Sequence, residues 1–221
     1  VVTAGGTREP IDPVRFLGNK SSGRQGLAIA AAAQRAGARV RVIAANIDDS
    51  VMACLPSSVE VTRVGSAQQM REATLAQVRG ADALVMTAAV ADFRPEATHA
   101  SKMKKDPSTS DAPTLRLVRN PDILSEVGHS VTRPPLVVGF AAETGTDEQI
   151  LAYGADKAAR KGADYIALNR VGAGVGFGDV PNDIRLLDAS GAIVGRYTGS
   201  KDEVAAGLIG QIAAFLDSLE R

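Results

Sequence analysis

The sequence has few or none of several residue types that mark particular protein classes. It has no tryptophan, 4% aromatic residues and a single cysteine, Cys54, so an internal disulfide framework and a cysteine-based zinc site are excluded. We interpret Cys54 as a buried structural thiol in a reducing compartment. No stretch approaches the roughly 18 consecutive apolar residues of a membrane span. These absences predict a soluble, cytoplasmic protein with no membrane partner.

The charge balance points away from a polyanionic partner. The 221 residues include 25 Lys and Arg and 25 Asp and Glu, and the formal net charge is zero. No overall field therefore favours nucleic acid, and any anion site has to be local. The length and the 45% hydrophobic content predict one domain over residues 1–221. Because the chain begins at Val1, inside a predicted strand, we expect it to be part of a longer polypeptide.

Short apolar runs alternate with segments of helical period along the chain. We predict strands at residues 1–4, 39–46, 83–90, 115–118, 136–143 and 164–169. Helices are predicted between them, at 26–37, 66–80, 122–130 and 146–161. Helical crossovers join parallel strands, so the pattern predicts a mixed, mostly parallel sheet with helices on both faces.

The C-terminal part departs from this alternation. Residues 183–197 alternate apolar and polar side chains around Ser190 and Gly191, which predicts a β-hairpin. A helix capped by Ser200 and Glu203 follows. We assign its apolar stripe to the core, at Val204, Leu208, Ile212, Phe215 and Leu219. Residues 94–113 and 171–182 show no periodicity and are predicted to be functional or mobile loops. Residues 44–60 receive no role.

Residues 4–26 form the first candidate site. They separate the first strand from the first helix by a glycine-rich, basic stretch, whereas such connections typically run about two to six residues. Ligands in open α/β sheets lie at the carboxyl ends of the strands. We predict an anion site there, made by backbone N–H groups of Gly5 and Gly6 and by the helix start near Ser22 and Gly23. The alternative is a purely structural connection.

Two groups of lysines are further candidates. Lys102 belongs to a cluster at 102–105, which is either a solvated surface or a phosphate contact folded over the strand ends. Lys157 and Lys161 lie four residues apart on one helix face, where like charges repel unless a polyanion bridges them. Together with residues 4–26, these lysines predict that the protein binds a triphosphate and a second, phosphorylated substrate.

A dehydrogenase is a weaker alternative. Tyr153 and Lys157 have the Tyr-x-x-x-Lys spacing of short-chain dehydrogenases. However, the GGTREP turn lacks the glycine spacing of a dinucleotide site, and the second strand ends in Ala45 and Asn46 without an acid for a ribose.

Several motifs together resemble one family. GGTREPIDPVRFLGNKSSGRQG, AAVADFRP, SKMKK, RNPDIL, VVGFAAET and the lysine pair occur in this order over almost the whole chain. This set resembles the phosphopantothenoylcysteine synthetase domain, which bacteria fuse behind a flavin-dependent decarboxylase. The resemblance implies a three-layer Rossmann-like (ribokinase-like) α/β fold, a homodimer, and ligation of 4′-phosphopantothenate to L-cysteine. CTP would drive the reaction through an acyl cytidylate, with Mg²⁺ held mainly by the phosphates and no assigned protein ligand.

The resemblance also assigns roles to residues. Lys102 would serve the first, nucleotide-dependent step, Arg15 and Asn19 would bind phosphopantothenate, and Asn19 would polarise the acyl carbonyl. Ala89 would lie beside the same substrate. The polarity and length of the 94–113 segment predict that it closes as a lid and excludes water. The full predicted nucleotide site comprises Gly5, Gly6, Ser22, Gly23, Ala88, Asp92, Lys102, Asn120, Pro121, Asp122, Ile123, Phe140, Lys157 and Lys161. A nucleotide-binding module without ligase activity is the other function left open.

Overall fold

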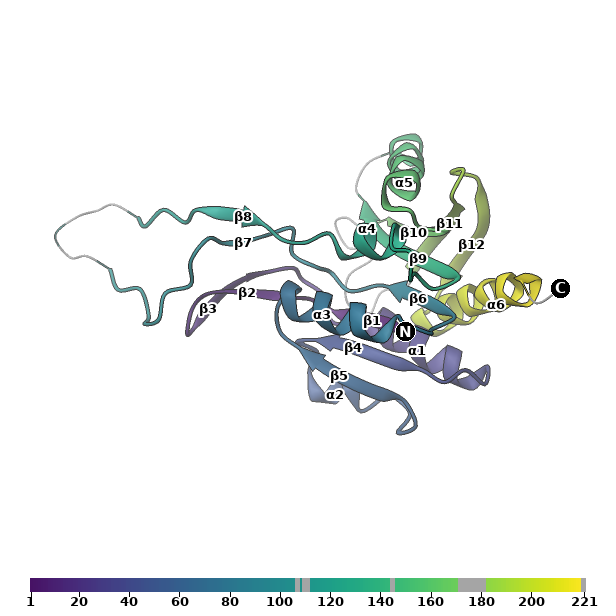
Figure 1. The fold of residues 1–221 in the computed structure, drawn as a ribbon, viewed down its shortest axis with the longest axis horizontal. Helices are drawn as coiled ribbons and strands as arrows, with labels where there is room; N and C mark the ends of the chain where they lie inside the picture. Colours follow the sequence, from purple (N-terminus) through teal and green to yellow (C-terminus); the bar gives the residue numbers. More distant parts are fainter. Residues whose placement is uncertain (106–107, 109–111, 144–145, 171–181, 220–221) are drawn as a thin grey trace.

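The protein is a three-layer α/β structure built on an eight-stranded sheet (Figure 1). The computed structural model describes residues 1–105, 108, 112–143, 146–170 and 182–219. The strand order is β12-β11-β10-β9-β6-β1-β4-β5, parallel from β10 to β5 and antiparallel across β10, β11 and β12. The sheet strands are β1 (Val2–Gly5), β4 (Arg41–Ala45), β5 (Glu60–Val64), β6 (Ala83–Met86), β9 (Leu136–Glu143), β10 (Tyr165–Arg170), β11 (Asn182–Asp188) and β12 (Ile193–Gly199).

Helices bury apolar side chains against both faces of this sheet. On one face α1 (Arg24–Arg35) and α6 (Lys201–Leu219) pack on side chains such as Val2, Val42 and Val138. On the other face α3 (Ala67–Gln77), α4 (Ile123–Gly128) and α5 (Asp147–Lys161) cover neighbours such as Ile43 and Val137. Adjacent strand residues thus point to opposite cores, which is why the strands read as continuous apolar runs.

Side-chain caps fix where the helices begin. Ser66 and Gln69 form a capping box at the start of α3, and Thr146 and Gln149 form one at the start of α5. Ser200 and Glu203 exchange hydrogen bonds in the same pattern before α6. These helices therefore begin within a residue or two of where the sequence predicts.

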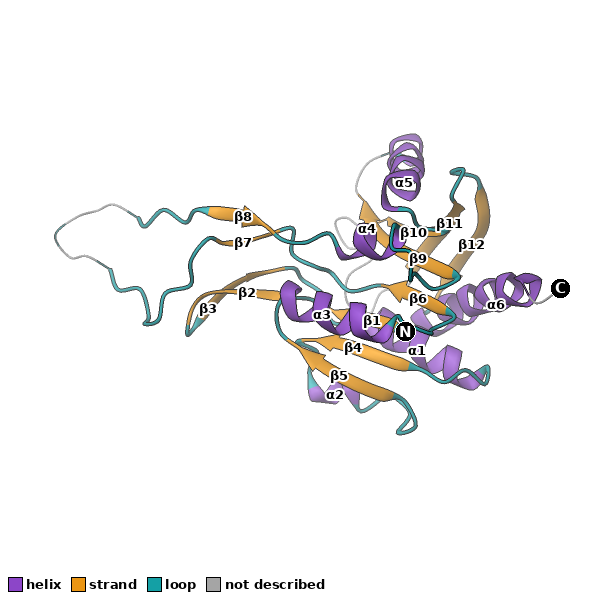
Figure 2. Cartoon of the chain, viewed as in Figure 1, coloured by secondary structure: helices purple, strands orange, loops and turns teal. Residues whose placement is uncertain are grey.

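Two antiparallel ribbons project from the sheet as a long arm, which extends to the left in Figure 1. One is β2 (Arg8–Asp12) with β3 (Arg15–Gly18), and the other is β7 (Phe93–Pro95) with β8 (Leu117–Arg119). We call these ribbons and the described residues 96–116 the arm. Figure 2 shows that strands and loops make up the arm, whereas all helices lie against the sheet. His99 N donates to Ile11 O at 2.9 Å and ties the two ribbons together.

The arm corrects two predictions. Residues 4–26 were expected to form one long loop, but they contain the β2–β3 hairpin. The strand expected at 115–118 was assigned to the central sheet, but β8 pairs only with β7 in the arm. Short amphipathic strands have the same local pattern in a ribbon as in a sheet, so the sequence does not distinguish the two.

Residues 44–60, which were assigned no role, include α2 (Asp49–Met52) and lead into β5. Two smaller predictions were wrong. Cys54 is exposed at the end of α2 rather than buried. Leu219 is 56% exposed because α6 runs past the edge of the core, whereas Phe215 still packs edge-on against Tyr165 at 5.7 Å between ring centroids. Within the described ranges, every helix falls short of the length or apolarity that a bilayer crossing requires.

The contrast along α6 can be tested by two truncations. Leu208 is fully buried and Leu219 is exposed. We expect Leu208→Ala to lower the free energy of unfolding by about 2–5 kcal/mol, because it removes packed methyl groups and leaves a cavity. Leu219→Ala should change it by less than about 0.5 kcal/mol. Urea denaturation followed by circular dichroism measures both, and equal effects would contradict the assignment of the core.

Candidate functional site

The order of the strands fixes the position of the site. From β1 the chain first builds β4 and β5 on one side and then β6, β9 and β10 on the other, so the order reverses between β1 and β6. Ligand crevices in open α/β sheets form at such a point, beyond the carboxyl ends of the strands. Hydrogen bonds from Ala89 N to Gly5 O, at 2.8 Å, and from Thr7 N to Ala89 O, at 3.1 Å, hold the two strand extensions together there.

The larger of two adjoining cavities at this edge has a volume of about 550 Å³. Its floor comes from the ends of β6 and β9, and its walls come from the base of the arm, the start of α4 and one face of α5. Nine of the predicted nucleotide residues line it: Ala88, Asp92, Asn120, Pro121, Asp122, Ile123, Phe140, Lys157 and Lys161. The structure thus brings together residues that are far apart in the sequence.

Both lysines of this larger cavity face a carboxylate. Lys161 contacts Asp122, the N-cap residue of α4, and Lys157 Nζ lies 3.6 Å from Glu143 Oε1 at the end of β9. Burial by itself would raise the pKa of Asp122. Hydrogen bonds from Lys161 and Ser125 N, with the charges of Lys161 and Arg160, outweigh it and lower that pKa. Asp122 therefore stays ionised and orients an ammonium group toward the cavity.

The smaller cavity, of about 180 Å³, lies between the start of α1 and the ends of β6, β9 and β10. Three residues predicted from the sequence line only this cavity, namely Ser22, Gly23 and Ala89, and Ala88 and Phe140 line both cavities. The predicted nucleotide residues are thus divided between two connected spaces. Lys20, Arg24 and Lys201 make the smaller one strongly basic.

Gly5 and Gly6 are explained by the fold. Gly5 has φ +87°, and a Cβ there would lie 2.0 Å from Ala45 O. Gly6 N donates to Ala45 O at 3.0 Å. Neither glycine is among the described residues that line the two cavities. Their assignment to a nucleotide stays a prediction with no support from this arrangement.

Arg15 and Lys102 lie on the arm, outside both cavities. Arg15 Nε and Nη2 donate to Asp12 Oδ2, and Arg15 Nη2 also donates to Met103 O at 2.8 Å. Met103 N in turn donates to Asp12 Oδ2 at 3.1 Å. This network fixes Lys102, next to Met103, on the β2–β3 ribbon. Asn19 lies nearer the site, where its Nδ2 donates to Val90 O at 3.3 Å.

Asp12 is the buried centre of that network. Its side chain has no exposed surface. The hydrogen bonds from Arg15 are the main reason that its pKa lies far below the usual value, and backbone N–H groups of Val14, Met103 and Arg15 add to them against the effect of burial. A depressed pKa means that the ionised form stabilises the fold above the ordinary pKa, near 3.8. This stabilisation is lost as the pH falls through the lower, folded value.

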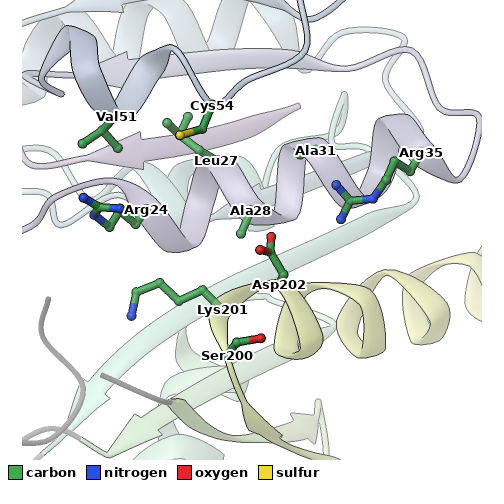
Figure 3. Close-up of a pocket in the computed structure, with 10 residues that line it drawn as sticks. All are labelled: Arg24, Leu27, Ala28, Ala31, Arg35, Val51, Cys54, Ser200, Lys201 and Asp202. Atoms are coloured by element: carbon green, nitrogen blue, oxygen red, sulfur yellow. The ribbon is translucent and has the colours of Figure 1, made fainter. Parts of the chain in front are cut away.

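A third cavity, of about 510 Å³, lies between α1, α2 and the start of α6 (Figure 3). It contains Cys54 and no residue assigned from the sequence. Tyr153, the other half of the dehydrogenase motif, is 59% exposed and is not among the described residues that line the larger cavity, whereas Lys157 is. The Tyr-x-x-x-Lys spacing therefore marks no shared site.

Sequence reasoning missed several lining residues of the smaller cavity. Lys20 and Gln25 lie within the first of the quoted motifs but were assigned no role, and Asn182 and Lys201 lie at element ends outside every quoted motif. Asn169 was noted only as the end of a strand. The predicted loop at 171–182 lies outside the described residues except for Asn182, as do residues 106–107 and 109–111 of the predicted lid.

Comparison with known proteins gives a consistent result. Residues 1–216 match the family described as "DNA/pantothenate metabolism flavoprotein C-terminal domain". The "Coenzyme A biosynthesis bifunctional protein CoaBC" of Mycobacterium bovis is 44% identical over 222 residues, which cover 98% of this chain and 52% of that protein. Its counterpart in Haemophilus influenzae is 39% identical over 211 residues, covering 96% of this chain and 50% of that protein. The chain spans about half the length of these curated relatives.

Solved structures resemble the fold over nearly its whole length. The C-terminal domain of a bifunctional CoaBC protein aligns with a TM-score of 0.75 at 32% identity, covering 98% of this chain and 94% of that domain. A Cab2 mutant, solved in complex with phosphopantothenate-cysteine, aligns with a TM-score of 0.72 at 15% identity, over 98% of this chain and 85% of that one. The second likeness concerns the fold alone.

The Asp12 network gives a testable prediction about the arm. We expect Asp12→Ala to release the segment around Met103, so that trypsin cleaves after Lys102, Lys104 and Lys105 about tenfold faster, because charge-assisted hydrogen bonds are the strongest of their kind. Asp49→Ala is the matched control, since it removes an exposed ion pair with Arg63. Peptide mass spectrometry of timed digests measures the rates. Equal rates in both variants would mean that Asp12 does not hold this segment.

Proposed function

The chain belongs to the family of DNA/pantothenate metabolism flavoprotein C-terminal domains, and from this membership we propose that it ligates 4′-phosphopantothenate to L-cysteine in coenzyme A biosynthesis. The observation that carries the proposal is the larger cavity, which gathers nine of the residues that the motifs assign to a nucleotide. A bare nucleotide-binding module needs no second basic cavity beside the first. The adjoining smaller cavity therefore favours a two-substrate enzyme.

The first half-reaction activates a carboxylate. The carboxylate of phosphopantothenate attacks the α-phosphorus of CTP, pyrophosphate leaves, and an acyl cytidylate forms. Both reactants are anions, so the reaction needs cations where the charge develops. Lys157 and Lys161 line the cavity from one face of α5 and are suited to hold the triphosphate. Asn120 Nδ2 donates to Ala91 O at 2.8 Å and keeps the cavity wall in place.

Magnesium fits the chemistry of this cavity. The described residues include no cluster of three or more His, Cys, Asp or Glu side chains able to hold a metal by themselves. Asp92 and Asp122 nevertheless line the cavity, and Mg²⁺ is commonly held by one or two carboxylates together with substrate phosphates. Bound there, it would neutralise charge on the phosphates and on the leaving pyrophosphate.

The second half-reaction forms the amide. The amine of cysteine attacks the acyl carbonyl, and CMP leaves. We propose that Asn19 polarises this carbonyl. Its Nδ2 donates to Val90 O, and Val90 lines the larger cavity, so Asn19 lies beside that cavity. Ala89, on the smaller cavity, would lie beside the pantothenate chain. Arg15 would bind the same substrate, although it lies on the arm.

The position of the arm favours a homodimer. The arm carries exposed apolar side chains without a core of its own, among them Val14, Phe16, Leu17, Leu115 and Leu117. Exposed apolar patches of this kind mark interaction surfaces. We propose that a second copy of the chain covers them. Arg15 and Lys102 would then act at the larger cavity of the partner subunit.

The CoaBC relatives are about twice as long as this chain, which supports a bifunctional polypeptide. We propose that this domain follows a flavin-dependent phosphopantothenoylcysteine decarboxylase domain. Such an enzyme would consume the product of the ligase directly.

The ligase proposal is tested by pyrophosphate release. With phosphopantothenate, Mg²⁺ and CTP, we expect release without cysteine in a first turnover and continuous release with it, and much less with ATP. Lys161→Gln should slow release about 10²-fold or more, because a charge that balances the phosphates is lost. Lys104→Gln is the matched exposed control. A folded chain that binds CTP but releases no pyrophosphate would be a binding module instead.

Mixing two inactive variants tests the dimer. Lys102→Gln damages only the arm, and Lys161→Gln damages only the cavity. If the arm of one subunit serves the cavity of the other, an equal mixture should recover about a quarter of wild-type activity, since half of the dimers are mixed and each has one intact site. Analytical ultracentrifugation verifies the dimer. A mixture that stays inactive, in verified mixed dimers, would contradict this arrangement.

A further inference from the structure

Two residues that line the smaller cavity carry a hydrogen-bond acceptor without a donor among the described residues. Asn169 Oδ1 and Asn182 Oδ1 are buried, and neither has a partner among the described residues. Asn169 lies in β10, Asn182 begins β11, and both residues line this cavity. Asn182 is 3% exposed, so water does not readily satisfy it. Almost all buried polar atoms have partners, and an exception calls for a cause.

The neighbouring hydrogen bonds fix which atom of Asn182 is the acceptor. Asn182 Nδ2 donates to Gln25 Oε1 at 2.6 Å, and Gln25 Nε2 donates to Lys201 O at 3.4 Å. Turning the Asn182 amide over would put two oxygens against each other, and turning both amides would put Gln25 Oε1 against Lys201 O. The carbonyl oxygen of Asn182 is therefore the group left for another donor.

The rest of the cavity carries positive charge. Lys20, Arg24 and Lys201 line it, and no Asp or Glu is found among its described lining residues. Figure 3 shows the side chains of Arg24 and Lys201 at the starts of α1 and α6, extending on the same side. Gly23 is the N-cap of α1, and no side chain in the described part of the chain caps that helix. This end of the cavity therefore attracts an anion.

We infer that the smaller cavity is the binding site of the amino-acid substrate, with its amino group on the two asparagine oxygens and its carboxylate toward the basic end. The inference rests on the proposed ligase function and deepens it. An amino acid carries both groups, a multiple N–H donor and an anion, on one carbon atom. A metal cation would also bind carbonyl oxygens, but it carries no anionic group, and the described lining residues offer it no carboxylate. The volume of 180 Å³ is below the roughly 300–1,000 Å³ of sites for larger ligands.

This site would also prepare the amine for reaction. The cations among the described lining residues lower the pKa of a bound ammonium group, so its proton passes to solvent and the nitrogen lone pair becomes available. The amine nitrogen then bonds to the acyl carbon, the bond from that carbon to the phosphate oxygen breaks, CMP leaves, and a second proton is released. Ala88 and Phe140 line both cavities, so the amine lies next to the nucleotide.

The test replaces Asn169 by Leu in the 221-residue chain. We expect the KM for L-cysteine to rise about tenfold or more, because hydrogen bonds to a charged group are lost. The first-turnover release of pyrophosphate without cysteine should stay near the wild-type value. Thr74→Val is the matched control, since Thr74 Oγ1 is also buried and unpartnered among the described residues but lies in α3. Asn182→Leu is a second variant, although it also removes the bond to Gln25.

Ligand analogues give a measurement that does not depend on a mutant. In the wild type, cysteamine, which lacks the carboxylate, and 3-mercaptopropionate, which lacks the amine, should each compete with L-cysteine at least about tenfold more weakly than L-serine does. An unchanged KM for cysteine in folded Asn169→Leu would overturn the inference, as would an altered Mg²⁺ dependence with an unchanged KM.

Failure of the ligase proposal can be recognised separately. In that case the wild-type chain itself releases no pyrophosphate with any nucleotide. Calorimetric titration of L-cysteine into the unreacted chain then tests the binding site independently of ligase activity. The proposed cysteine site is supported if L-cysteine binds to the wild type and to Thr74→Val but not to Asn169→Leu. It is overturned if L-cysteine does not bind to the wild type.

Discussion

The close approach of α1 to the sheet is the constraint on which the site depends. A Cβ on Gly26 would lie 2.4 Å from Thr87 Oγ1 and 2.6 Å from Ala4 Cβ, so only glycine lets the helix come this near to β1 and β6. The start of the helix thereby lies beside the ends of both strands. The smaller cavity exists because the helix start, the β6 extension and the end of β10 meet there. A helix packed further out would leave an open groove instead of two adjoining cavities.

Charge is arranged locally in a chain whose net charge is zero. The larger cavity holds lysines that are each paired with a carboxylate, whereas the smaller cavity holds cations and amide groups without a carboxylate among its described lining residues. The two spaces therefore suit different ligands, although they share Ala88 and Phe140. Such separation would let one sheet edge hold the proposed polyanion and zwitterion next to each other.

The sequence predicts the sheet and its helices well but not the arm. The parallel strands are continuous apolar runs, and capping residues such as Ser66 and Thr146 mark the helix starts, so local patterns are sufficient. The ribbons of the arm are stabilised by long-range contacts, as between Asp12 and Met103, which no local pattern reveals. For the same reason, the sequence motifs identified residues that line the larger cavity, but they did not identify Asn182 and Lys201, which line the smaller one. Their role arises only when separate element ends meet.

The carboxylates beside Lys157 and Lys161 have a consequence for turnover. Because Glu143 and Asp122 already neutralise these ammonium groups, an arriving phosphate gains only the difference between two ionic interactions. Binding is then an exchange of one counter-ion for another, and the departure of a phosphate restores the internal pair. In the proposed reaction, such an exchange would weaken the hold on pyrophosphate, a product with high charge that would otherwise dissociate slowly. It would also keep stray anions from occupying the cavity between catalytic cycles.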